Sequence, residues 1–303
     1  MPPSRTHSRA RAVVMAGCLA VVVSLSAVVG GAVSVGSRLS ASDEPDASDQ
    51  PQTHVIYFVA KDGVDEELDA NGTLADAIRG IRAWFARETS SDGRRALRPR
   101  IDSLQGGGFD ISFVRGNGNK SEYTSLDRLY DELAARGFKA ANKRYLVFAG
   151  LSGDAPGNPG GTCGQGYYPL PAFELRQLSV VYLDANPGCG TRNFGGGTAG
   201  SAGRAEAVAV EEWLHNEGIV PAGAPHHCPT NPFHICTAAL WMVSDRQWPV
   251  EIQELDPEVY DVMFPLAKYK LSNLRLDPDR DDYLDHGLPI TDLRQSPFLE
   301  TVG

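Results

Sequence analysis

Residues 210–218 read VEEWLHNEG and are the most informative stretch of this 303-residue chain. They form the second half of a predicted helix over about residues 204–217, which Gly218 is well placed to end. At about 100° per residue, Glu211 and His215 lie about 40° apart on the helix surface, and Glu212 lies on the flank. Ionisable side chains beside an apolar stripe are costly to bury unless they are paired or bind a metal, so this helix is a candidate metal-binding element.

The loop that follows the predicted helix is rich in histidine. Three of the chain's seven histidines fall within nine residues: His226, His227 and His234. Catalytic zinc commonly takes three protein ligands and a water, and histidine is a frequent ligand. In HExxH enzymes one helix supplies two ligands a turn apart. Glu211, His215 and a histidine of this loop are therefore candidate ligands for Zn²⁺.

With these residues the segment resembles the zincin metallopeptidases, and more narrowly a group of exported bacterial zincin-like proteins. That group carries the pattern HELLHxLGxVP, followed by APH and later by LDPGRDDYY. This chain has EEWLHNEGIVP over residues 211–221, APH over 224–226 and LDPDRDDY over 276–283. The likeness extends in element order over about residues 54–287, and its specific part covers about residues 205–287.

The resemblance implies an α/β (α+β) fold: a zincin-like layer domain with a mixed sheet, an active-site-type helix and an irregular, disulfide-pinned C-terminal part. It implies that Glu212 is the general base, that His215 binds zinc, and that His226 or His234 is a further ligand. Glu211 stands at the position of the family's first histidine, and a carboxylate oxygen can bind Zn²⁺ at about 2.0–2.2 Å. The implied substrate is a peptide or a protein.

Glu211 in place of a histidine leaves three interpretations open. In an atypical zinc peptidase, Zn²⁺ would polarise the scissile carbonyl and acidify a water whose proton Glu212 takes. In a pseudoenzyme, the same scaffold would serve as a non-catalytic extracellular binding or structural module. The third interpretation is that the likeness is coincidental. Convergence of Glu211, His215 and a downstream histidine, with about one bound zinc, would support the first.

The chain before this helix alternates between strand and helix patterns. Apolar runs rich in β-branched and aromatic residues predict strands over 54–60, 109–114, 145–150 and 179–183. Apolar residues at helical spacing predict two helices, around 74–85 and 126–133. This order, followed by the third helix, is typical of an α/β layer domain.

The N-terminal residues have the composition of a targeting segment. Three arginines precede an uncharged stretch, Ala12–Ser37, which is the pattern of an export signal. The stretch also exceeds the about 20 residues that a membrane-spanning helix needs, so a cleaved signal and an uncleaved anchor both remain open. We therefore predict a signal peptide or anchor over 1–38, a flexible acidic linker over 39–53, and a single extracytoplasmic domain over 54–303. The domain would be secreted or anchored at the cell membrane, touching the membrane only through the N-terminal segment.

The net charge bears on the partner of this protein, and the cysteine content bears on its compartment. The chain has 28 Lys and Arg against 38 Asp and Glu, a net charge of −10, which counts against a nucleic-acid partner. Four of the five cysteines lie beyond the apolar stretch, and an oxidising compartment would pair them in one of three connectivities. Local loops rich in glycine, proline or asparagine favour Cys163–Cys189 and Cys228–Cys236.

Overall fold

The computed structural model describes residues 48–90, 93–153, 162–167, 176–185, 189–218, 224, 250–251, 270–277, 280, 284 and 292–303. By internal contacts the chain divides into residues 1–37 and 38–303, and all described residues belong to the second unit. The predicted signal or anchor stretch lies outside the described residues. None of the helices within the described ranges is long and apolar enough to cross a membrane.

Strands and helices alternate through the described residues. Their bounds are β1 (Gln52–Val59), α1 (Thr73–Thr89), β2 (Leu97–Pro99), β3 (Ile111–Arg115), η2 (Lys120–Glu122), α2 (Leu126–Ala135), β4 (Lys143–Gly150), β5 (Gly164–Gly166), β6 (Leu178–Tyr182), α3 (Arg204–Glu217), β7 (Val250–Glu251), η7 (Leu271–Asn273), β8 (Leu274–Arg275), η8 (Leu293–Gln295) and β9 (Leu299–Thr301). The main sheet has the order β3-β1-β4-β6-β5. Its first four strands are parallel, and β5 runs antiparallel to β6 at the edge. The predicted α+β class and the mixed sheet are thus confirmed.

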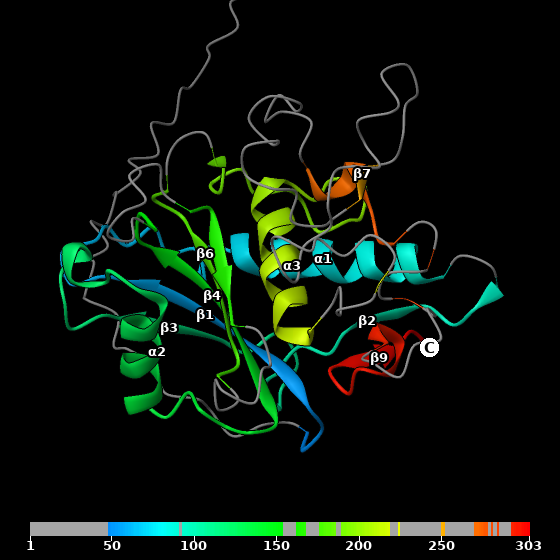
Figure 1. The fold of residues 1–303 in the computed structure, drawn as a ribbon, viewed down its shortest axis with the longest axis horizontal. Helices are drawn as coiled ribbons and strands as arrows, with labels where there is room; N and C mark the ends of the chain where they lie inside the picture. The colour runs from blue at the N-terminus through cyan, green and yellow to red at the C-terminus, as the bar shows by residue number, and fades with distance from the viewer. Residues whose placement is uncertain are drawn as a thin grey trace, which may run out of the picture. The chain divides into compact units, whose positions relative to one another are not determined.

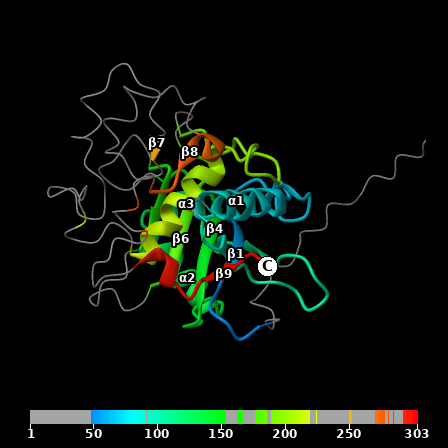
Figure 2. The same cartoon turned by 90° about the vertical axis from the view of Figure 1, so that its right-hand side faces the viewer.

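The sheet is covered on both faces, with α1 and α3 on one side and α2 on the other (Figure 1). Because side chains alternate along a strand, β1 contributes to two cores. Val55, Tyr57 and Val59 pack in the core that contains α1 and α3. Ile56 and Phe58 pack in the second core, with α2. Both views show α3 crossing α1 on the same face of the sheet (Figures 1 and 2).

The predicted elements correspond closely to the observed ones. The four predicted strands are β1, β3, β4 and β6, each with bounds within two residues of those predicted, and the third helix spans Arg204–Glu217 as predicted. β1 begins at Gln52, inside the segment predicted as linker. The short strands β2, β5, β7, β8 and β9 were not predicted.

One of the two predicted disulfides is present. Cys163 and Cys189 are joined, with 5.3 Å between their Cα atoms. Cys163 directly precedes β5, and Cys189 lies between β6 and α3. The bond therefore links the edge strand to the segment that leads into α3. The second predicted pair, Cys228–Cys236, lies outside the described residues.

A buried carboxylate fixes α2 to the loop after β3. The Glu132 side chain accepts hydrogen bonds from the Tyr123 hydroxyl at 2.7 Å, the Asn117 N–H at 2.7 Å and the Arg136 guanidinium at 3.0 Å. Burial alone would raise the pKa of Glu132, but these hydrogen bonds outweigh it and hold the pKa below its usual value.

The substitution Glu132→Gln is therefore expected to destabilise the fold by about 1.5–3 kcal/mol at neutral pH, the range for hydrogen bonds to a charged group. A carboxyl whose pKa is lowered in the folded state contributes stability above its unfolded pKa, and loses it as the pH falls through the folded value. The difference from the native sequence should thus shrink towards pH about 3, measured by urea unfolding. Asp131→Asn, an exposed change on the same helix, is the control; an equal effect at both pH values would contradict the assignment.

Candidate functional site

Helix α3 begins and ends at defined caps. At its N-terminus the Glu206 carboxylate accepts hydrogen bonds from the N–H groups of Gly195 (2.7 Å) and Gly203 (3.0 Å). Burial raises the pKa of Glu206, although these hydrogen bonds lower it in part. At the C-terminus Gly218 has φ +75°, the left-handed conformation that glycine adopts without strain. The caps fix the register of the residues between them.

Polar side chains attach α3 to the end of the sheet. The Ser179 hydroxyl donates to the carbonyl of Glu212 at 2.8 Å. The Asn216 amide donates to the carbonyl of Leu178 at 3.1 Å and also to that of Tyr167, just beyond β5. Strands β6 and β5 therefore hold the last turns of α3 directly.

Two glycines of β5 allow this close approach. A Cβ at Gly164 would lie 2.6 Å from Cγ of Glu212, and one at Gly166 would lie 2.5 Å from the Glu212 carbonyl oxygen. A Cβ at Gly166 would also lie 3.0 Å from Cβ of His215. Any larger residue at these positions would push the strand away from the helix. The antiparallel edge strand thus lies directly against the Glu212–His215 turn.

The three predicted site residues on α3 are all buried. Glu211, Glu212 and His215 are 8%, 4% and 8% exposed. The prediction placed them at the border of an apolar stripe, but every residue of α3 is buried, so the helix is enclosed on all sides. β5 covers part of this flank, because Gly164 and Gly166 approach Glu212 and His215 closely.

Other ionisable side chains lie around this turn. Burial raises the pKa of the Tyr182 phenol, and the negative charge of Glu212 raises it further. The Tyr182 hydroxyl donates to Oε1 of Gln165 on β5 at 2.7 Å. Further along the helix, burial raises the pKa of Glu217. The Arg144 guanidinium, at 3.2 Å, and the Ser296 hydroxyl donate hydrogen bonds to Glu217 and partly offset this increase. The C-terminal half of α3 is therefore a buried acidic segment.

The remaining predicted ligands are two histidines of the segment that follows α3. His226 and His234 lie outside the described residues, as do Cys228 and Cys236 of the predicted loop disulfide. Among the described residues, the predicted set is thus brought together only on α3 itself: Glu211, Glu212 and His215.

A second group of metal-ligand type was not predicted: His54, Asp102 and Asp110, whose candidate ligand atoms lie within 4.8 Å of one another. Burial alone would raise the pKa of Asp102, but hydrogen bonds from His54 and Lys143 outweigh it and lower the pKa. A histidine inside the apolar run over residues 54–60, together with an aspartate at each end of a glycine-rich turn, was the available sequence signal.

No protein-family model matches this chain. No curated protein matches it either. Among solved structures, wild-type OgpA from Akkermansia muciniphila has a TM-score of 0.38 at 15% identity, covering 57% of this chain and 49% of OgpA. A second crystal form of OgpA has a TM-score of 0.37 at 16% identity, covering 59% and 51%.

Catalytically inactive OgpA in complex with an O-glycopeptide substrate has a TM-score of 0.37 at 15% identity, covering 57% of this chain and 49% of OgpA. This chain thus spans about half the length of that protein. Similarity at this level assigns neither a family nor an activity, so the site is interpreted from its own residues.

Proposed function

We propose that α3 carries the catalytic centre of a zincin-type zinc peptidase in an atypical form, with EExxH in place of HExxH. The observation that carries the proposal is the packing of the Glu212–His215 turn against the antiparallel edge strand β5. In this proposal Glu212 would be the general base and His215 a zinc ligand, and both would lie beside a strand of the kind that can bind extended peptides.

The residues present fit a zinc ion. Glu211 and His215, one turn apart, supply an oxygen and a nitrogen donor, and His226 or His234 would supply the third. A carboxylate and an imidazole are both common zinc ligands. When bound, zinc would polarise a carbonyl and acidify a water. Glu212 would accept the proton of that water and pass it to the leaving amine.

The substrate would lie along β5. In the described sheet β5 pairs with β6 on one side and forms the edge on the other. An unpaired edge can bind an extended chain through backbone hydrogen bonds, with side chains alternating between the two faces. The substrate class is therefore a peptide or an extended protein segment.

The Cys163–Cys189 disulfide supports a location outside the cytoplasm, where such bonds persist. We accordingly propose that the domain acts after export, either secreted or anchored through its N-terminal segment.

The proposal is tested by zinc content and hydrolysis in the same preparation. Chelator-treated full-length chain, reloaded with Zn²⁺, should bind zinc at α3 and cleave a panel of peptides that includes O-glycopeptides. His215→Ala should lose about one zinc per chain and the hydrolytic activity. Asn273→Ala, an exposed change far along the chain, is the control.

The same measurements also test the alternative function, a non-catalytic extracellular module on this scaffold. Reloaded chain that cleaves no peptide of the panel, with zinc content unaffected by His215→Ala, would exclude the peptidase. Zinc that is lost in His215→Ala without hydrolysis by the native sequence would instead identify a pseudoenzyme with a retained metal site.

A further inference from the structure

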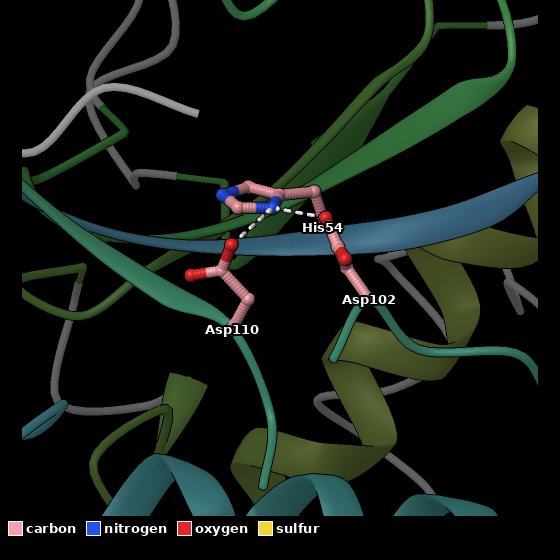
Figure 3. A group of neighbouring side chains, drawn as sticks. All are labelled: His54, Asp102 and Asp110. Carbon is pink, nitrogen blue, oxygen red and sulfur yellow. Dashed lines mark hydrogen bonds and ion pairs between the residues drawn. The ribbon is translucent and has the colours of Figure 1, made fainter. Parts of the chain in front are cut away.

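The second group of metal-ligand side chains lies on the opposite face of the sheet from α3. His54 of β1 is fully buried, and its ring contacts Phe138 and Tyr145 of the core that contains α2. Asp102 and Asp110 are also buried, at 0% and 6% exposure. Figure 3 shows the imidazole of His54 between the two carboxylates.

The backbone brings these three residues together. The Asp102 N–H donates to the carbonyl of Thr53 at 2.8 Å, which places Asp102 beside His54. The Asp110 N–H donates to the carbonyl of Asp102 at 3.0 Å, closing a turn over residues 102–110. The tip of this turn, residues 104–108, is exposed and contains three consecutive glycines. His54 is therefore the point where both ends of an exposed turn meet the sheet.

The distances fit a metal ion. Nδ1 of His54 lies 2.9 Å from Oδ2 of Asp102 and 3.9 Å from Oδ2 of Asp110. Ligand atoms about 2.1 Å from one ion lie about 2.9–3.4 Å apart for octahedral to tetrahedral angles. Movements of less than about 1 Å would thus bring the three atoms to an ion.

Further contacts orient the ligands and leave one oxygen in need of a partner. The Ser112 hydroxyl lies 3.0 Å from Nε2 of His54, so Nδ1 is the nitrogen directed at the carboxylates. The Lys143 ammonium donates to Oδ2 of Asp102 at 2.8 Å. The other oxygen, Oδ1 of Asp102, is buried and has no hydrogen-bond partner among the described residues. A buried carboxylate oxygen in that state is costly, and an ion bound by both oxygens of Asp102 would supply the missing contact.

The donor atoms also favour a divalent cation. A ring nitrogen with two carboxylate oxygens is a donor set that suits zinc and similar divalent ions. The Asp110 side chain, 8% exposed, provides the contact with solvent through which an ion would enter.

We infer that His54, Asp102 and Asp110 form a structural site for a divalent transition metal, independent of α3, that fastens the 102–110 turn to β1. The bound ion would replace the Nδ1 proton of His54 and join β1 to both ends of the 102–110 turn. The ion is expected to make the 102–110 turn more ordered. It should not affect the proposed catalytic centre, whose residues lie on the other side of the sheet.

The test uses full-length chain with the α3 ligand removed, His215→Ala, so that zinc at the proposed catalytic centre does not obscure the result. After chelation and reloading with Zn²⁺, His215→Ala should retain about one zinc per chain. The double variant His215→Ala, Asp110→Asn should lose it. His215→Ala, Gln105→Ala is the matched control: it changes an exposed residue of the same turn that is neither a proposed ligand nor a contact of one, and it should keep the metal.

Amide exchange provides a second measurement that needs no change in the cluster. Zinc should slow exchange at Leu104 and Gly107 at least about tenfold in His215→Ala, and histidine-ring NMR should show loss of the Nδ1 proton of His54. These data decide the question even if Asp110→Asn fails to fold. A His215→Ala chain that binds no zinc, or amide exchange that zinc leaves unchanged, would overturn the inference. Either result would mean that hydrogen bonds hold the cluster together without a metal. The proposed catalytic centre fails separately, through zinc content that is insensitive to His215→Ala.

Discussion

Peptide hydrolysis by the zinc-loaded chain is expected to fall by about 10²–10⁴-fold in Glu212→Gln, the usual contribution of a general base. The side chain faces the closest approach of β5, and glutamine has nearly the same shape but cannot accept the proton. Burial of Glu212 at 4% exposure means that bulk water cannot easily substitute for the missing base. The measurement is kcat and KM on the best peptide of the panel.

Zinc content distinguishes the proposed roles of the two adjacent glutamates, Glu211 and Glu212. Glu212→Gln should retain the zinc at α3, because the base is not a ligand, whereas Glu211→Gln should weaken zinc binding. KM should change less than kcat in Glu212→Gln, since the interaction is made in the transition state. Full activity in Glu212→Gln would remove this residue from its proposed role, whatever the zinc content.

Trp213→Ala is expected to destabilise the fold by about 3–5 kcal/mol, the range for a buried aromatic side chain. Trp213 is 3% exposed and packs edge-to-face on Phe85 of α1, with ring centroids 5.5 Å apart. Its indole N–H donates to the Thr53 hydroxyl of β1 at 2.9 Å. One side chain therefore joins α3 to helix α1 and to strand β1. Urea unfolding at pH 7 measures the loss.

Trp213→Phe separates packing from hydrogen bonding. Phenylalanine retains most of the ring contact with Phe85 but leaves the Thr53 hydroxyl without its donor, so it should cost less than the alanine substitution. Equal losses in the two variants would mean that the hydrogen bond dominates. A loss below about 1 kcal/mol in Trp213→Ala would contradict the role of this residue as an anchor.

The parts of the fold that were predicted depend on local pattern. The apolar run at 54–60 could only be a buried strand, and Gly218 marked the end of α3 because glycine accepts a positive φ. Ser179, Asn216 and the glycines of β5 then fix α3 against the sheet through contacts that no local pattern reveals. The helix was thus predicted correctly, and its complete burial was not.

The parts that were missed depend on contacts between distant residues. β5 reads GQG and has no strand signal of its own; it forms because it pairs with β6 and fits under α3. His54 meets Asp102 and Asp110 only because β1 pairs with the segments on either side of the 102–110 turn. Periodicity along one segment carries no information on which carboxylate will face which histidine in the folded chain.

The position of β1 between β3 and β4 determines the order in which this chain can fold. Val55 pairs with Ile111 on one side and with Leu146 on the other, so both partners of β1 follow it in the sequence. A chain that emerges N-terminus first exposes an apolar strand with one edge open until residues 111–115 have followed and the other open until residues 143–150 have followed. Open apolar edges are templates for pairing with other chains, and parallel pairing of distant segments is slow. Aggregation during synthesis should therefore begin at β1, and protection of that strand by a chaperone should matter most before β4 emerges.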